Sequence, residues 1–180
     1  MDELTPYRDF ARPLYDGKDI AHDFRHVERI ISRLDSLSEG LIPPPSRHRL
    51  YFLACFHGLG PRIDREPELR KKTISFLRSL GWQDTDIQEA LSSLATHLYH
   101  PRTAEERVVH DANYFEVPGA LGIAKAFTVG GTRGQSYEQT LEVFERNLDR
   151  VLFRTPAGKR SSEKRKAYAK DFIRKLREEL

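Results

Sequence analysis

Histidines are the residues of this sequence whose chemistry stands out first. His22 and His26 are four residues apart, so on one helix both side chains would face the same way. His57 follows the most apolar segment of the chain, where an imidazole needs a polar partner. A single histidine is more often a packed or solvated residue than a ligand, and one pair at this spacing is weak evidence for a metal.

Asp111 adds a carboxylate to these imidazoles. It comes shortly after the apolar pair Val108 and Val109, and a segment rich in Gly and Ala follows it, so its side chain is predicted to be at least partly buried. A buried carboxylate needs a counter-charge or a metal ion. Two imidazoles and one carboxylate form a ligand set that suits manganese, iron, zinc or a similar divalent ion.

The elements that would position these residues are predicted to be helices. Apolar residues recur every three or four positions from Phe24 to Leu37 and predict one continuous helix, which the following proline run would end. Ser46 is the expected N-cap of the next helix. Its segment Leu50–Phe56 is apolar on every side and should cross the centre of the domain.

The same period continues along the rest of the chain, and no segment alternates as a strand would. Gly58, Gly60 and Pro61 would stop the central helix. Gly130–Gly134 is predicted to be a flexible loop, and no Gly-Lys-Ser/Thr sequence follows it as in a P-loop. The remaining helices are expected over Glu66–Leu80, through Ile87, Leu91 and Leu94 after an N-cap at Asp84 or Thr85, from Pro101 to Asp111, and over Pro118–Phe127, Tyr137–Phe153 and Ser161–Leu180.

Length and composition predict one soluble all-α domain spanning residues 1–180. The chain has 38% hydrophobic and 32% charged residues, which is ordinary for a globular protein. No apolar run approaches the roughly 20 residues needed to cross a bilayer, and the N-terminus lacks the features of a signal peptide. Cys55 is the only cysteine, so a disulfide framework is excluded. We therefore expect a cytosolic protein that does not use a membrane.

The C-terminal region is basic, and the predicted helix at about 161–180 lies in it. From Arg154 to Leu180 there are ten Lys and Arg against four Asp and Glu, a local charge of +6 within a net charge of +3. Such a helix could dock on phosphates or nucleic acid. It is more often the solvated face of an amphipathic helix, and no nucleic-acid-binding motif accompanies it, so nucleic acid is the less favoured partner.

Three separate segments together resemble the motifs of the HD-domain metal-dependent phosphohydrolases. His22–Ile30 (HDFRHVERI) resembles the opening motif, whose first metal ligand matches His26. Leu53–Gly60 (LACFHGLG) resembles the His-Asp doublet, with His57 as its histidine. His110–Phe127 (HDANYFEVPGALGIAKAF) resembles the closing motif, with Asp111 as the final ligand. The resemblance extends from His22 to the end of the chain and implies a single-domain helical bundle of the HD type.

One departure from the family pattern concerns the metal. Gly58 stands where the family has the doublet aspartate, which binds the metal and bridges the two ions of two-metal members. Further histidines that two-metal relatives have in the region Glu66–Phe76 are also missing, so a second metal is not expected. The resemblance still implies one divalent ion, manganese, iron, zinc, nickel or magnesium, held weakly by His26, His57 and Asp111. Gly58→Asp is then expected to strengthen metal binding.

Two functions follow from this resemblance. The first is a metal-dependent phosphohydrolase acting on a phosphomonoester or nucleotide through a weakened mononuclear site. His22, Arg29 and His97 are its expected catalytic residues, and Arg133 and His100 would contact the substrate. The alternative is a catalytically degenerate HD domain that binds a nucleotide or a protein partner. The sequence indicates neither the particular substrate nor the oligomeric state.

Overall fold

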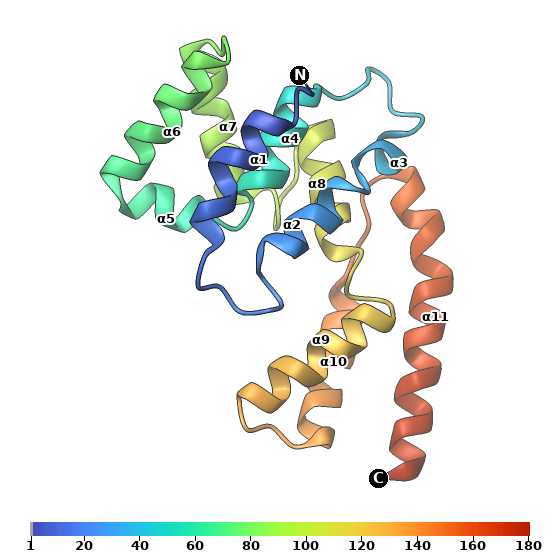
Figure 1. Ribbon diagram of the computed structural model, residues 1–180. Coiled ribbons are helices and arrows are strands. Elements are labelled where there is room, and N and C mark those ends of the chain that lie inside the picture. The colour runs from blue at the N-terminus through green and yellow to red at the C-terminus, as the bar shows by residue number, and fades with distance from the viewer. Residues whose placement is uncertain (1) are drawn as a thin grey trace.

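The computed structural model of the protein describes residues 2–180, which form helices and loops without a β-strand (Figure 1). The all-α prediction is therefore confirmed over these residues. In chain order the helices are α1 Thr5–Ala11, the 3₁₀ helix η1 Arg12–Tyr15, α2 Phe24–Ile31, α3 Leu34–Ser38, α4 Arg47–Phe56, α5 Gly60–Arg65, α6 Pro67–Ser79, α7 Asp84–Thr96, α8 Ala104–Tyr114, α9 Ala120–Thr132, α10 Tyr137–Arg150 and α11 Pro156–Glu179.

Helix α4 lies at the centre of the larger core, as its apolar sequence predicts. Every residue of Leu50–Phe56 is buried, and α4 contacts α1, α2, α7 and α8. The side chain of Ser46 accepts a hydrogen bond from the backbone N–H of Arg49, which confirms the predicted N-cap. Because α4 is enclosed by other helices, His57 at its C-terminal end is held inside the domain.

The helix predicted from Phe24 to Leu37 is wrong in its continuity, because α2 and α3 are separated at Ser32 and Arg33. Apolar residues on both sides of the break are buried in the same core, so the hydrophobic spacing does not reveal it. The hydroxyl of Ser32 and the guanidinium of Arg33 both donate to the carbonyl of Arg29. Side chains that bond to the backbone in this way offer it an alternative to the helical ladder.

Two other predicted boundaries are corrected by the structure. Pro61 does not end a helix. It lies in the first turn of α5, where the N–H that proline lacks would have no partner within the helix. The N-cap of α7 is Gln83, without a side-chain capping bond, and Asp84 forms an ion pair with Arg78 instead.

Helices α9 and α10 form an antiparallel hairpin joined by a short turn. The predicted loop at Gly130–Gly134 is wrong in its first half, because α9 continues through Gly131 to Thr132. A Cβ atom at position 130 would collide with the hydroxyl of Thr140, so glycine here permits the close approach of α10. Ser136 and Gln139 form a capping box that starts α10.

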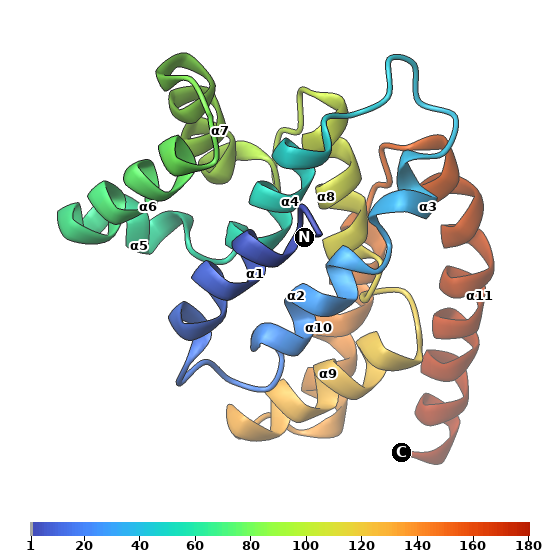
Figure 2. The same ribbon diagram turned by 45° about the horizontal axis from the view of Figure 1, so that its top comes forward.

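Helix α11 begins at Pro156, five residues before the predicted start, and extends along one side of the molecule (Figures 1 and 2). Several of its basic side chains form ion pairs: Arg174 pairs with Asp171 and Glu178, as helical neighbours often do, and Arg177 with Glu145 of α10. Within residues 2–180, none of the helices has the length and apolar character that crossing a bilayer requires.

Two hydrophobic clusters hold these helices together. The larger one is built around α4 and includes residues from α1, α2, α3, α7 and α8. The smaller one joins α9, α10 and the second half of α11, and its buried members are Ile123, Leu141, Phe144, Leu148, Ala169 and Ile173. In both views the α9–α10 hairpin lies below α2 and α8, on the side of the molecule away from α6 and α7 (Figures 1 and 2).

Candidate functional site

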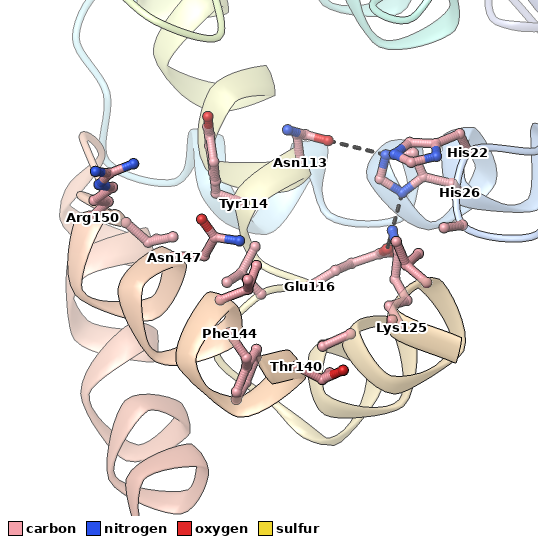
Figure 3. Close-up of a pocket in the computed structure, with 18 of the residues that line it drawn as sticks. His22, His26, Asn113, Tyr114, Glu116, Lys125, Thr140, Phe144, Asn147 and Arg150 are labelled. Carbon is pink, nitrogen blue, oxygen red and sulfur yellow. Dashed lines mark hydrogen bonds and ion pairs between the residues drawn. The ribbon is translucent and has the colours of Figure 1, made fainter. Parts of the chain in front are cut away.

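His26 lies near the start of α2 with both ring nitrogens in contact with polar groups. Asp23 caps the helix by accepting a hydrogen bond from the backbone N–H of His26, which fixes the position of this residue. The ring Nδ1 donates to Oε2 of Glu116 at 3.0 Å, and Nε2 lies 3.0 Å from Oδ1 of Asn113 (Figure 3).

The hydrogen bonds of His26 leave it without a free lone pair. A ring that donates from Nδ1 to Glu116 and from Nε2 to the amide oxygen of Asn113 is protonated at both nitrogens. If the amide of Asn113 turns by half a rotation, its NH₂ group donates to the lone pair of a neutral ring instead. In either arrangement, neither nitrogen of His26 is available to a metal ion.

His57 follows α4, and its ring lies 5.1 Å from that of His26, measured between centroids. Its Nδ1 donates to the carbonyl of Ala54 at 3.0 Å. Burial lowers the pKa of His57 to about 3, and the neighbouring His26 contributes in the same direction. The ring is therefore neutral near pH 7, and its Nε2 lone pair remains the one imidazole nitrogen of this pair that could bind a metal.

An ammonium group lies beside Gly58. Lys18 Nζ donates to the carbonyl of Gly58 at 2.8 Å and lies over the ring of Tyr15, 4.4 Å from its centroid. A Cβ atom built at position 58 would be 3.0 Å from this Nζ. The backbone of Gly58 does not have a positive φ, so a side chain is sterically allowed there once Lys18 moves. The place expected for a carboxylate thus borders on a positive charge.

Asp111 is fully buried on α8, but its carboxylate contacts the start of α11 rather than the two histidines. It accepts hydrogen bonds from the backbone N–H groups of Arg154 at 2.8 Å and Thr155 at 2.7 Å, and from the hydroxyl of Thr155 at 2.8 Å. His110 Nδ1 donates to it at 2.9 Å. Gly158 lies so close that a Cβ atom there would collide with the carboxylate. Asp111 therefore anchors α8 to α11.

The residue of α8 that reaches His26 is Asn113. Successive residues of an α-helix are rotated by about 100°, so Asp111 and Asn113 point to nearly opposite sides of α8. Asp111 is of the residue type expected for a metal ligand, but it lies on the other face of α8. The side chain of α8 that does reach His26 is a neutral amide.

These donors do not fit the divalent ion that the fold family implies. Gly58 offers no side chain, the oxygens of Asp111 are bonded to donors from α11 and His110, and His26 has no free lone pair. Among residues 2–180, no group of three or more His, Cys, Asp or Glu side chains is placed to hold a metal ion. His57 alone is left with a free ligand atom.

Glu116 is the charged centre of the site, and it is not among the residues predicted from the sequence. Its buried carboxylate accepts from His26, from Arg29 at 2.5 Å and from Lys125 at 3.0 Å, with Arg33 at 3.5 Å. Burial alone would raise the pKa of Glu116, but hydrogen bonds from His26 and Arg29 hold it well below its usual range. An acidic residue among the apolar and aromatic neighbours at 114–117 was the signal that could have revealed it.

Arg29 and His22 have partners of their own. Arg29, a predicted catalytic residue, is engaged with Glu116. His22 lies in the turn before α2, not on the helix, and its exposed ring contacts Asp19. The centroids of His22 and His26 are 6.5 Å apart. Of these predicted residues, His22 and His26 line the cavity described next.

A cavity of about 700 Å³ lies between the α9–α10 hairpin and the ends of α2 and α8 (Figure 3). One face of α9 and one face of α10 line it at helical spacing. The residues of these two faces are Lys125, Ala126, Val129 and Arg133 from α9 and its C-terminal end, and Val143, Phe144, Asn147 and Arg150 from α10. The cavity volume is within the range that small-molecule sites occupy.

Of the remaining predicted residues, Arg133 lines the cavity and His97 and His100 do not. His97 is buried at the end of α7, where Nδ1 donates to the carbonyl of Ser93 at 2.9 Å. Burial lowers the pKa of His97, and its Nε2 has no hydrogen-bond partner among the described residues. His100 is exposed, and Tyr99 between the two histidines lines the cavity instead.

No protein-family profile and no curated protein matches the sequence. Solved structures do match. Lin1889 from Listeria innocua is 20% identical, with 98% of this chain and 94% of that chain covered and a TM-score of 0.77. An HD-superfamily hydrolase from Bacillus thuringiensis is 24% identical, with 99% and 96% covered and a TM-score of 0.76. YpgQ from Bacillus subtilis, in complex with ADP, is 18% identical, with 99% and 98% covered and a TM-score of 0.74. Over nearly its whole length, this chain therefore has the fold of the HD-superfamily hydrolases.

Proposed function

We propose that this domain binds a nucleotide or a similar phosphorylated small molecule in the α9–α10 cavity and does not hydrolyse it through a metal ion. The observation that carries the proposal is the charge of the cavity lining. Arg133, Arg150 and Lys125 line the cavity, and its single acidic residue, Glu116, is already paired with cations. A cavity with this lining favours an anion.

The two arginines are free to contact a ligand. Both side chains are exposed, and neither forms a hydrogen bond or ion pair among the described residues. Guanidinium groups bind phosphate oxygens through charge-assisted, often bidentate hydrogen bonds. The ADP in the YpgQ complex supports a nucleotide as the ligand class, since that protein has the same fold.

The hydrogen bonds of the expected metal ligands support a function without metal chemistry. A mononuclear hydrolase with His26, His57 and Asp111 as ligands remains the second candidate, and the closeness of the two histidine rings favours it. That candidate requires Asp111 to leave the N–H groups of Arg154 and Thr155, and His26 to lose a partner. Both changes would break buried hydrogen bonds, which is costly. We therefore rank binding without metal-dependent hydrolysis first.

Calorimetric titration with ADP tests this proposal. Wild-type protein should bind ADP in the presence of EDTA, and Arg133→Ala combined with Arg150→Ala should weaken binding by at least about tenfold through loss of charge-assisted bonds. Arg146→Ala is the matched control, because Arg146 is an exposed arginine of α10 that does not line the cavity.

Phosphate release separates the two candidates. Wild-type protein with ADP and excess manganese should release no phosphate above the rate without protein. Manganese-dependent release that His57→Ala abolishes would overturn the proposal and support the mononuclear hydrolase.

A further inference from the structure

The cations around Glu116 outnumber its single negative charge. Arg29, Arg33 and Lys125 form ion pairs with this buried carboxylate, and none of the three pairs with another carboxylate among residues 2–180. Burial lowers the pKa of Arg165 on α11, and the charge of Glu116 opposes this shift. Four positive groups therefore share one negative charge, which leaves an excess of three. Positive charge that is partly withdrawn from water is costly unless an anion compensates it.

Arg165 is the member of this group without a bonded partner. In the described part of the chain, no carboxylate forms an ion pair with its guanidinium, and its buried Nε atom has no hydrogen-bond partner. The Cζ atom of Arg165 lies 4.3 Å from the centroid of the Phe115 ring, and that of Arg33 lies 5.1 Å from the same centroid. Burial lowers the pKa of Arg33, and the charge of Arg165 acts in the same direction. Two like charges are therefore held close together.

The guanidinium of Arg165 also lies against the N-terminus of α9. A Cβ atom at Gly119, the N-cap residue, would collide with Nη2 of Arg165. In both views the connection from α8 to α9 passes beside α11 (Figures 1 and 2). Among the residues that the structure describes, no side chain caps this end of α9, and its first turn has no acidic residue. Because a helix N-terminus favours a negative group, a guanidinium at this place is unfavourable without an anion beside it.

We propose that Arg165, Arg33 and the first-turn N–H groups of α9 form a second binding site, which takes a single phosphate group. Guanidinium groups bind phosphate oxygens through charge-assisted hydrogen bonds, and the N–H groups of a helix N-terminus add further donors. A phosphate carries about two negative charges near pH 7, which offsets most of the excess. Neither arginine lines the α9–α10 cavity, so this site is separate from the proposed function.

Titration with inorganic phosphate at constant ionic strength tests this site. Wild-type protein and the double variant Arg133→Ala, Arg150→Ala are both titrated, because the double variant removes the contribution of the cavity. In both proteins, the backbone amide resonances of Ala120 and Leu121 should shift and saturate in two-dimensional NMR spectra. Arg165→Gln should weaken the affinity for phosphate by at least about tenfold, because charge-assisted bonds are lost.

Arg160→Gln is the matched control, since it removes the same charge from an exposed position of α11. It should change the phosphate affinity by less than about twofold, as expected for a screened surface charge. Arg165→Lys keeps the charge but loses the planar fork, so it should retain part of the affinity. This variant also replaces Arg165→Gln if thermal unfolding shows that the glutamine variant does not fold.

A phosphomonoester identifies the source of the phosphate group. Glycerol 3-phosphate that binds as tightly as inorganic phosphate would support a site for the phosphate group of a larger molecule. Binding at least about tenfold weaker would support a site for free phosphate.

Three results would overturn this site. They are equal phosphate affinities of wild-type protein and Arg165→Gln, an equal loss of affinity in Arg160→Gln, and the lack of a saturable shift at Ala120 and Leu121. None of them bears on the proposed function, which depends on ADP binding in the α9–α10 cavity.

Discussion

Two buried carboxylates, those of Asp111 and Glu116, lie five residues apart in the sequence and accept hydrogen bonds from different kinds of donor. Asp111 is surrounded by backbone N–H groups and a hydroxyl from the start of α11, together with His110. Glu116 is surrounded by the side chains of Arg29, Lys125 and His26 from α2 and α9. The first carboxylate joins two helices, and the second holds a ring of cations beside the cavity.

The difference shows that residue type alone does not identify a functional carboxylate. Backbone N–H groups cannot turn towards a bound ligand as a long side chain can. The partners of Asp111 therefore favour a structural role for this carboxylate. Partners of Glu116 are long side chains, one of which, Lys125, also lines the cavity. The region of Asp111 should therefore determine stability, and the region of Glu116 should determine both stability and its dependence on pH.

Asp111→Ala should have the largest effect on stability. It removes the acceptor of the N–H groups of Arg154 and Thr155, and we expect a loss of about 3–5 kcal/mol in the free energy of unfolding. Urea denaturation measures this loss. Asp35→Ala, at an exposed aspartate of α3, is the control and should change stability by less than about 0.5 kcal/mol. A loss of under about 1 kcal/mol for Asp111→Ala would show that α11 is anchored by other contacts.

Glu116→Gln should cost less, about 2–3 kcal/mol, because the partly exposed cations around it can turn towards water. The pKa of Glu116 is lower in the folded protein than its usual value, so its ionised form stabilises the fold at neutral pH. That contribution should be lost progressively as the pH falls below about 5.

Acidification then separates the two proteins. From pH 7 to pH 3, wild-type stability should fall more steeply than that of Glu116→Gln, as measured by urea unfolding at each pH. Parallel curves would mean that Glu116 does not titrate differently in the folded and unfolded states.

The smallest of these expected effects is the change in manganese affinity when metal ligands are restored. The sequence predicts that Gly58→Asp strengthens metal binding, but a carboxylate at this position would meet Lys18 and could pair with it. We now expect Gly58→Asp alone to change manganese affinity by less than about threefold, and Gly58→Asp with Asn113→Asp to raise it by about tenfold or more. Gly58→Asn is the uncharged control. Calorimetric titration with manganese measures the affinity of each variant. Tight binding by Gly58→Asp alone would support the expectation from the sequence that a carboxylate at position 58 is sufficient to strengthen the metal site.

The sequence predicted the helices better than the faces they present. The apolar run of α4 and the cap at Ser46 were sufficient to place the central helix, because both are local features. The break between α2 and α3 was missed because the hydrophobic stripe continues across it. Asn113 was missed for a different reason: the rotation of α8 depends on packing against α3, α4 and α2, which no local pattern contains.

The two hydrophobic clusters have a consequence for hydrogen exchange. Among residues 2–180, six buried hydrophobic side chains and four partly buried ones packed against them hold α9, α10 and the second half of α11 together, whereas the cluster around α4 is several times larger. Amide protons of α9 and α10 should therefore exchange through local opening, while those of α4 should require global unfolding. A ligand bound between α9 and α10 stabilises the closed state, so the amide protons that it slows will report where it lies.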